Sequence, residues 1–193
     1  MSKYVIVDLE MCRVPYSQQT DEFPFGTEII QIGAVALDEN YEIADIFCSL
    51  VRPQYGCVDE YIHGLTGITR ESTEKSEPFK AVMTRFAEWL PEDVVFVAWS
   101  DNDERQIQTE IDAKGLEEEI FDLFFDEWKD CQLLFSEKLQ RNRIYKLTEA
   151  LNMANIYYDD GAHDALVDAK NTALLFKKIM TEEKLTLSPY FIL

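Results

Sequence analysis

Apolar and polar positions follow a strand-like pattern in the first part of the chain. Three runs of strand character cover residues 4–10, 28–37 and 41–51. Residues 38–40, with the sequence Asp-Glu-Asn, separate the second run from the third and suit a tight hairpin. We therefore expect antiparallel strands in the first half of the chain, with residues 18–27 as the main early loop.

The apolar spacing becomes helical after Pro78. Apolar residues recur with helical spacing over residues 79–90, and residues 94–98 (VVFVA) form a short apolar run typical of a buried strand. Helical spacing returns in four later segments, at residues 103–114, 131–139, 146–154 and 164–180. This succession predicts an α/β fold with a mixed sheet and helices on its faces.

Length and composition fit a single domain. The chain has 193 residues, of which 47% are hydrophobic, and this is enough to bury a substantial core. We find no internal repeat and no low-complexity linker in the sequence. Residues 1–193 are therefore predicted to form one domain that ends in a tail at residues 181–193.

Three features of the sequence predict a cytoplasmic protein without a membrane partner. Charged residues interrupt the apolar stretches well short of the ~20 residues that cross a membrane. The N-terminus lacks a basic region followed by an apolar run, as a secretion signal would have. The four cysteines contain no CxxC pair, which favours free thiols in a reducing compartment.

The charge balance is strongly acidic. The formal net charge is −19, from 18 Lys and Arg against 37 Asp and Glu. This argues against a protein that holds long nucleic acid on a wide basic face. It does not exclude phosphate chemistry, because two bound divalent ions would bring positive charge to the place where a phosphate lies. For most of these carboxylates the simpler interpretation is a solvated surface.

Two carboxylates share one face of the first predicted strand. Alternation along residues 4–10 puts Asp8 and Glu10 on the same side, about 6 to 7 Å apart along the chain. Two such groups at the end of a core strand repel each other unless a cation lies between them. The strand therefore indicates a site for a divalent metal.

A third carboxylate lies at the start of the helix that follows the VVFVA strand. Ser100 or Asp101 is a natural N-cap there, and Asp103 falls in the first turn. Asp103 has the apolar Ile107 four residues later, whereas Asp101 has Arg105. We therefore expect Asp101 to cap the helix and Asp103 to be the functional acid.

A histidine and a fourth carboxylate follow in the sequence GAHDALVDA. On one continuous helix His163 and Asp168 would lie about 140° apart. They converge only if His163 precedes the helix, and Gly161 favours a loop at that point. Asp164 then caps the helix while Asp168 points inward. The rival assignment makes Asp164 the ligand, because it shares a helix face with Asp168.

One stretch of the chain is locally basic, the sequence SEKLQRNRIYKL with Lys138. Arg141, Arg143 and Lys146 in this stretch are candidate contacts to a phosphate. The alternative is a solvated helix end or loop.

These motifs together resemble the DEDDh exonucleases of the ribonuclease H-like fold. Asp-x-Glu at residues 8–10, the acid at Asp103 and His-x4-Asp at residues 163–168 stand in that family's order. The segments DLEMC, EIIQIGAVALD and KLTEALNMANI, with HGLTGIT as a loop at residues 63–69, are similar to the branch of the histone-mRNA exonucleases. The likeness runs from about residue 4 to residue 180. Many relatives have Asn four positions before the second-motif Asp and an aromatic residue directly before it. This chain has Trp99 and Asn102 at these positions, and the difference concerns the substrate pocket.

The resemblance implies a mixed five-stranded sheet and a site for two metal ions. Asp8 would bridge both ions, Glu10 and Asp168 would complete the site that activates water, and Asp103 would hold the second ion more loosely. A set of carboxylates favours Mg²⁺ or Mn²⁺ over Zn²⁺, and such an ion pair supports phosphodiester hydrolysis. His163 would take the proton from water, since an imidazole with a pKa near 6.5 can do so at neutral pH.

The implied activity is a 3′-5′ exonuclease that releases nucleoside 5′-monophosphates. Its expected substrates are single-stranded RNA or DNA, or short oligonucleotides. An acidic protein can act on such substrates because it needs to hold only a few of their phosphates. Met11, directly after Glu10, is the expected apolar contact for a terminal base or sugar, with ordinary core packing as the alternative. His63 is expected to be structural or close to the substrate, without assigned chemistry. The alternative function is a non-catalytic binding or scaffold subunit that keeps the fold.

Overall fold

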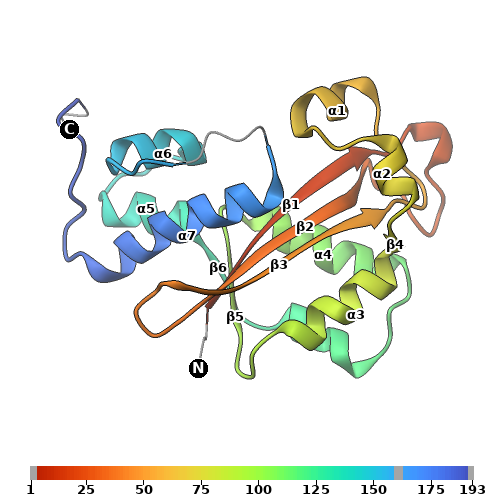
Figure 1. Ribbon diagram of the computed structural model, residues 1–193, viewed down its shortest axis with the longest axis horizontal. Coiled ribbons are helices and arrows are strands. Elements are labelled where there is room, and N and C mark those ends of the chain that lie inside the picture. Colours follow the sequence, from red (N-terminus) through yellow and green to blue (C-terminus); the bar gives the residue numbers. More distant parts are fainter. Residues whose placement is uncertain (1–3, 159–162, 191–193) are drawn as a thin grey trace.

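The computed structural model describes residues 4–158 and 163–190 (Figure 1). Within these residues a six-stranded sheet has the strand order β4-β3-β2-β1-β5-β6. β1 pairs antiparallel with β2, and β2 with β3, while the other pairs are parallel, so the sheet is mixed as predicted. The strands are β1 (Tyr4–Arg13), β2 (Thr27–Leu37), β3 (Ile43–Arg52), β4 (Glu77–Pro78), β5 (Val95–Ala98) and β6 (Trp128–Asp130).

The helices follow the sheet in chain order. Every segment that was predicted as helical after Pro78 contains one. The α-helices of the described residues are α1 (Glu60–Thr66), α2 (Arg70–Glu74), α3 (Phe79–Trp89), α4 (Asp101–Ala113), α5 (Cys131–Lys138), α6 (Leu147–Met153) and α7 (Ala165–Thr181), with 3-10 helices η1 (Tyr16–Gln18) and η2 (Glu119–Phe125).

Helices cover both faces of the sheet (Figure 1). Val5 and Val7 point from β1 into a core that is completed by α3, α4 and η2. Ile6 points to the opposite face, into a second core with α5, α6 and α7. Because neighbouring residues of a strand alternate between faces, Asp8 and Glu10 belong to the face that α7 covers.

The sheet has six strands where five were expected. The hairpin prediction is confirmed, since β2 and β3 pair antiparallel with Ala34 opposite Phe47. The count differs because of the two shortest strands, β4 with two residues and β6 with three. Elements of this length do not show a period-two pattern, so the sequence gives no signal for them.

The loop prediction for residues 63–69 is wrong over most of its length. His63 lies inside α1, which Asp59 caps by accepting a hydrogen bond from the Ile62 amide at 2.8 Å. The helix ends at Gly67, whose φ of 72° is the left-handed conformation that glycine adopts without strain. Thr69 then caps the start of α2 and forms a reciprocal capping box with Ser72.

A glycine allows α7 to approach the sheet closely. Gly33 of β2 lies opposite Asp8 of β1. A Cβ at this position would come within 2.3 Å of the Ala165 carbonyl carbon and of the Leu166 nitrogen. The missing side chain therefore brings the N-terminal turn of α7 directly over the strand pair that carries Asp8.

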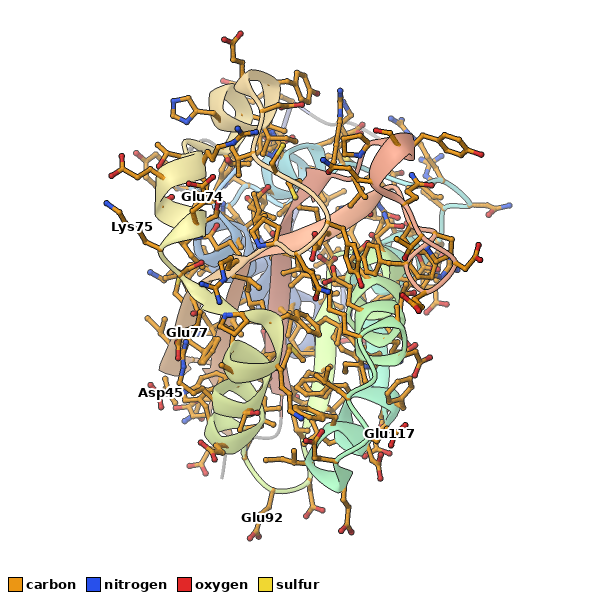
Figure 2. All side chains as sticks on the ribbon, turned by 90° about the vertical axis from the view of Figure 1, so that its right-hand side faces the viewer. Asp45, Glu74, Lys75, Glu77, Glu92 and Glu117 are labelled. Carbon is orange, nitrogen blue, oxygen red and sulfur yellow. The ribbon has the colours of Figure 1, made fainter. Side chains whose placement is uncertain are left out.

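Acidic side chains spread over the surface on the α3 side of the molecule (Figure 2). Asp45, Glu77, Glu92 and Glu117 are all exposed, although Asp45 accepts a hydrogen bond from the Trp89 indole and Glu77 pairs with Arg85. This agrees with a solvated surface for most of the acidic residues. Among the described residues there is no helix with the length and apolar character that crossing a membrane requires.

Candidate active site

The first two carboxylates lie side by side on β1. Asp8 pairs with Gly33 and Glu10 pairs with Gln31 in the register of β1 and β2. The register shifts between Glu10 and Met11, so a bulge follows the acidic pair directly. Glu10 is buried, with 8% of its surface exposed. The expected placement of both acids on one strand face is confirmed.

Asp103 enters from the N-terminal turn of α4. Its side chain is 7% exposed, and its Oδ1 accepts a hydrogen bond of 3.1 Å from the Leu9 amide of β1. This bond joins α4 to the strand between Asp8 and Glu10. The expectation that Asp101 caps the helix is wrong, because Ser100 is the N-cap. Asp101 is the first helical residue and pairs with Arg105.

The last motif lies at the start of α7. Asp164 is the N-cap, and its Oδ1 accepts hydrogen bonds from the Leu166 and Val167 amides at 3.0 and 3.1 Å. Its other oxygen accepts from the Gln31 amide group at 3.1 Å. His163 precedes the helix, as predicted, and Asp168 lies one turn inside it. Because capping and Gln31 engage both oxygens of Asp164, the structure favours Asp168 over this rival as a metal ligand.

These elements bring the predicted site residues together. One potential ligand atom from each of Glu10, His163 and Asp168 lies within 4.8 Å of the other two. Asp8 and Asp103 belong to the same group. The charges of Glu10 and Asp168 raise the pKa of Asp8, and the charge of Asp168 raises the pKa of Asp103. The charge of Asp103 in turn raises the pKa of Glu10. We call Asp8, Glu10, Asp103 and Asp168 the acidic cluster.

Burial raises the pKa of every member of the acidic cluster, and nearby carboxylates add to the rise. Burial raises the pKa of Glu10 to about 8, with Asp168 as the first of the repelling carboxylates. Burial likewise raises the pKa of Asp103 to about 7, although the hydrogen bond from Leu9 opposes this. Burial and then the charge of Asp103 raise the pKa of Asp8 well above its ordinary value. Burial also raises the pKa of Asp168, and His163 opposes it.

The acidic cluster has the chemistry of a site for hard divalent cations. Four carboxylates offer oxygen ligands only, and the charged side chains that affect their pKa values are other carboxylates and His163. A bound divalent cation would remove the repulsion that raises these pKa values. The residues present therefore fit a metal site of the kind that the sequence predicts.

A cavity of about 780 Å³ opens beside the acidic cluster. Asp168 and His163 line one part of it, and the segment before α6 lines another. Its wall is both aromatic and polar, with Trp99, Gln132, Arg143, Tyr145, Lys146 and Tyr158 among its residues. We call it the main cavity.

Comparisons with known proteins agree on one family. The family model described as Exonuclease matches residues 5–176. The chain belongs to the exonuclease family. This confirms the DEDDh resemblance that the motifs indicate, and exonucleases of this type depend on divalent metal ions.

Individual relatives of this exonuclease-family chain include bacterial and animal proteins. The chain is 30% identical over 195 residues to the 3′-5′ exonuclease DinG of Bacillus subtilis (strain 168), covering 97% of this chain and 18% of DinG. It is 30% identical over 181 residues to ERI1 exoribonuclease 2 of Danio rerio, covering 81% of this chain and 32% of that protein. The chain thus spans less than a third of the length of these two relatives.

Solved exonuclease structures share the fold. The nuclease domain of 3′hExo, a DEDDh family member bound to rAMP, has a TM-score of 0.76 at 21% identity, covering 96% of this chain and 95% of that one. Cell-death related nuclease 4 (CRN-4) has a TM-score of 0.74 at 21% identity, covering 92% of this chain and 63% of that one. These similarities confirm the ribonuclease H-like fold for the exonuclease-family chain.

The basic stretch of the exonuclease-family chain contributes to the main cavity in part. Arg143 and Lys146 line it, but Arg143 is also paired with Glu149 at 2.7 Å and stacks over the Tyr145 ring. Arg141 is not one of the described residues that line this cavity. Gln140, with a φ of 54°, turns the chain just after α5, and the Arg141 amide donates to Ser136 in that turn. The prediction of a phosphate contact therefore has geometric support for Arg143 and Lys146 only.

Met11 lies at a separate, smaller cavity of about 340 Å³. Thr27, Asn102 and Gln106 line the same cavity, and the Thr27 hydroxyl hydrogen-bonds to the Gln106 side chain at 2.9 Å. Met11 is half-buried and also packs against the core on the α3 side of the sheet, so the alternative of ordinary core packing stays open. The expected apolar contact for a base or sugar stays a prediction.

A second group of buried charges lies outside the acidic cluster, and the motifs gave no sign of it. The Lys114 ammonium contacts Glu28 at 2.7 Å and Glu110 at 2.6 Å, and all three side chains are almost fully buried. Glu28 also accepts hydrogen bonds from three consecutive backbone amides, at residues 54–56. Glu110 accepts from the Ile29 amide at 2.6 Å. We call Glu28, Glu110 and Lys114 the ion-pair cluster.

Proposed function

We propose that this protein is a metal-dependent 3′-5′ exonuclease that acts on single-stranded RNA or DNA, or on short oligonucleotides, and releases nucleoside 5′-monophosphates. One observation carries the proposal. The side chains of Glu10, His163 and Asp168 converge from distant parts of the chain, with Asp8 and Asp103 acting on the same group through their charges. Relatives named as 3′-5′ exonucleases support the direction of cutting.

The acidic cluster would hold two Mg²⁺ or Mn²⁺ ions. In this proposal Asp8 would be a ligand of both ions, Glu10 and Asp168 would complete one site, and Asp103 would complete the other. Two bound divalent ions would offset the charge of the phosphoryl oxygens, lower the pKa of a water molecule and stabilise the leaving alkoxide. The chain itself supplies orientation, through the bond from Leu9 to Asp103 and the capped start of α7.

His163 is the proposed general base. Its ring nitrogen takes the proton of the attacking water as the water oxygen bonds to phosphorus and the bond to the 3′ oxygen breaks. The 3′ oxygen leaves with the electron pair and is protonated from solvent. His163 is exposed, next to Asp168 and at the wall of the main cavity, so it can exchange its proton with solvent between turnovers.

Substrate contacts are proposed at two places. Arg143 and Lys146, in the wall of the main cavity, would contact phosphates, and Met11 would contact the terminal base or sugar. The surroundings are strongly acidic, so few phosphates need be held at once. Solved relatives bound to rAMP and to a dT13 oligonucleotide support a nucleic-acid substrate class.

Two further expectations stay proposals. We propose that residues 1–193 form one exonuclease domain with a tail at residues 181–193, and that the protein acts in the cytoplasm. Limited proteolysis checks the first, because a single domain yields one protected fragment, and cell fractionation checks the second.

The proposed activity is tested with one oligonucleotide labelled at either end. The purified protein is incubated with 5′-labelled or 3′-labelled single-stranded RNA and DNA in Mn²⁺, with and without EDTA. We expect a ladder from the 5′-labelled strand, immediate release of a labelled mononucleotide from the 3′-labelled strand, and no reaction in EDTA. Release of a mononucleotide from the 5′-labelled end would contradict the direction. Intact RNA and DNA in all arms would favour a non-catalytic binding or scaffold subunit.

A further inference from the structure

A second cavity, of about 630 Å³, lies between the end of α6 and the C-terminal segment. These two parts of the chain lie at the same end of the molecule in Figure 1. The cavity is distinct from the main cavity and shares no lining residue with it. We call it the tyrosine cavity, and its lining residues are Asn152, Asn155, Ile156, Tyr157, Ser188 and Tyr190.

Two tyrosines of this cavity are almost fully exposed. Tyr157 is 98% exposed and Tyr190 is 92% exposed, although folding usually removes much of an aromatic ring from water. Both rings belong to one cavity and therefore offer two flat apolar surfaces at the same place. Exposed aromatic rings beside a cavity are the feature by which proteins stack unpaired bases without reading their sequence.

We propose that the tyrosine cavity binds an unpaired base of a single-stranded substrate, several nucleotides upstream of the bond that is cut. Tyr157 and Tyr190 stack on the base, and the amides of Asn152 and Asn155 can hydrogen-bond to its edge. The site rests on the proposed exonuclease function, because that function supplies the strand. It is separate from the contacts that the reaction requires.

The composition of the cavity selects a base over other ligands. Its described lining contains no Lys or Arg, so it lacks the groups that hold a free phosphate. It also contains no carboxylate, so a divalent cation has no charged ligand there. Aromatic rings with amide and hydroxyl groups remain, and these match a neutral, flat and polar-edged ligand. Stacking also requires no positive charge, which suits a chain with a net charge of −19.

The backbone around the cavity is held in place before any ligand arrives. The Ser188 amide donates to the Met153 carbonyl at 2.8 Å and ties the C-terminal segment to α6. Asn155 has a φ of 53°, and its amide donates to the Asn152 carbonyl at 3.1 Å. The Lys178 ammonium donates to the Ala154 carbonyl at 2.5 Å, which joins the same turn to α7. The backbone of the site therefore needs little ordering when a ligand binds.

The tyrosine cavity adjoins the main cavity through one side chain. The Asn152 amide group lines the tyrosine cavity and donates to the Tyr158 hydroxyl at 3.3 Å. Tyr158 lines the main cavity together with His163 and Asp168. The neighbouring residues Tyr157 and Tyr158 thus belong to the two cavities in turn. In this proposal a strand whose 3′ end lies at the acidic cluster runs through the main cavity and past Tyr158 to the tyrosine cavity.

The proposal is tested by the dependence of KM on substrate length. The parent protein, Tyr157→Ala and Tyr190→Ala are compared on 5′-labelled, unstructured RNA and DNA of 2 to 12 nucleotides in Mn²⁺. For the parent we expect KM to fall with length and then level off. Each alanine variant should raise KM for the 12-mer about tenfold or more, because stacking on one ring contributes a factor of this order. Dinucleotide cleavage should stay within about twofold of the parent.

Two control variants separate stacking from folding. Tyr157→Phe keeps the ring and should restore the parent KM for the 12-mer. Tyr16→Ala removes another ring that is 91% exposed, in η1, and should leave KM at every length unchanged. Equal KM values for the 12-mer in the parent and both alanine variants would overturn the site. Preference for RNA or for DNA in the length-dependent step identifies which strand the cavity takes.

A binding measurement keeps this proposal separate from the catalytic one. Fluorescence anisotropy of a labelled 12-mer is recorded in Ca²⁺ instead of Mn²⁺. Ca²⁺ occupies carboxylate sites, so binding can be measured without turnover. We expect both alanine variants to bind about tenfold more weakly than the parent, whether or not the parent cleaves RNA or DNA. An active parent with unchanged binding in the variants overturns the tyrosine cavity alone. An inactive parent whose binding depends on Tyr157 overturns the proposed hydrolysis alone.

Discussion

The acidic cluster and the ion-pair cluster are both groups of buried carboxylates, but they balance their charge in different ways. In the ion-pair cluster Lys114 lies within 2.7 Å of both Glu28 and Glu110. Backbone amides and the Gln106 side chain satisfy the remaining carboxylate oxygens. In the acidic cluster, the charges that act on each carboxylate come from the other acids and from His163.

The difference separates a group that stabilises the fold from a group that binds something else. Burial raises the pKa of Glu110, but Lys114 lowers it again. Among the described residues no cation lowers the pKa of Glu10, which rises to about 8. A buried charge without a counter-charge is costly and is retained where it serves a ligand or a reaction. The comparison therefore points to the acidic cluster as the candidate metal site, because the fold leaves its charge uncompensated.

The largest expected effect is on turnover, from Asp168→Asn. The substitution keeps the size of the side chain but removes one anionic ligand, so we expect turnover in Mn²⁺ to fall at least about 1000-fold. Gel analysis of 5′-labelled oligonucleotide cleavage measures it. The metal-free variant should be at least as stable as the parent at pH 8, because one repelling charge is gone. The exposed Asp122→Asn is the control and should retain full turnover; a comparable loss there would undo the assignment.

His163→Ala is expected to reduce turnover about 100-fold or more, because general-base assistance contributes a factor of this size. Single-turnover cleavage rates measure the effect, and calorimetric titration with Mn²⁺ should give an affinity close to that of the parent. His63→Ala is the matched control, since His63 contacts the Ile68 carbonyl in the α1 turn and has no proposed chemistry. A His163→Ala variant as fast as the parent would remove the general-base role.

Lys114→Met should affect stability and leave chemistry largely intact. It strips Glu28 and Glu110 of their buried cation, and breaking a buried pair costs about 3–5 kcal/mol of unfolding free energy. Urea denaturation measures this loss, and turnover per folded molecule should remain within about threefold of the parent. Lys80→Met removes an exposed ion pair with Glu118 and should change stability little. Equal stability of Lys114→Met and the parent would show that the two clusters do not differ as described.

The smallest expected effect is the pH dependence of stability in the absence of metal. The folded protein keeps protons on Glu10 and Asp103 up to their raised pKa values of about 8 and 7, whereas the unfolded chain releases them at ordinary values. The folded state therefore binds more protons in this window, and stability falls as pH rises from about 5 to 8. Thermal melts in EDTA should show Tm falling by about 5 °C or more.

Two controls sharpen the pH experiment. Glu10→Gln should flatten the fall of Tm between pH 5 and 8, because it removes one titrating group. Mn²⁺ should raise Tm more at pH 8 than at pH 6, since binding at the lower pH must displace protons. A Tm increase with Mn²⁺ that is the same at both pH values would contradict a metal site built from these carboxylates.

Much of the fold could be predicted from the sequence because its main elements are long. β1, β2 and β3 each span ten or eleven residues, and α3 and α7 show helical spacing over at least three turns. β4 and β6 are too short for any period. The two small helices around Gly67 were missed because their boundaries depend on caps, which a hydrophobic pattern does not show.

The candidate site could be located from the sequence because its residues stand in local motifs, while the features around it depend on distant partners. Asp8 and Glu10 share a strand face, and His163 and Asp168 flank a helix start. The pairing of Lys114 with Glu28 joins positions 86 residues apart, and no spacing in the sequence announces it. The choice of Ser100 over Asp101 as the cap depends on where β5 ends, which the sequence defines only to within a residue or two.

The close approach that Gly33 permits also makes the acidic cluster depend on the docking of one helix. β1 and β2 pair directly with each other, whereas Asp168 belongs to α7, which lies far along the chain from both strands. Asp8, Glu10 and Asp103 therefore lack their fourth partner until α7 has packed on the sheet. A bulkier residue at position 33 would push α7 away from β1 and open the acidic cluster without altering any of its carboxylates.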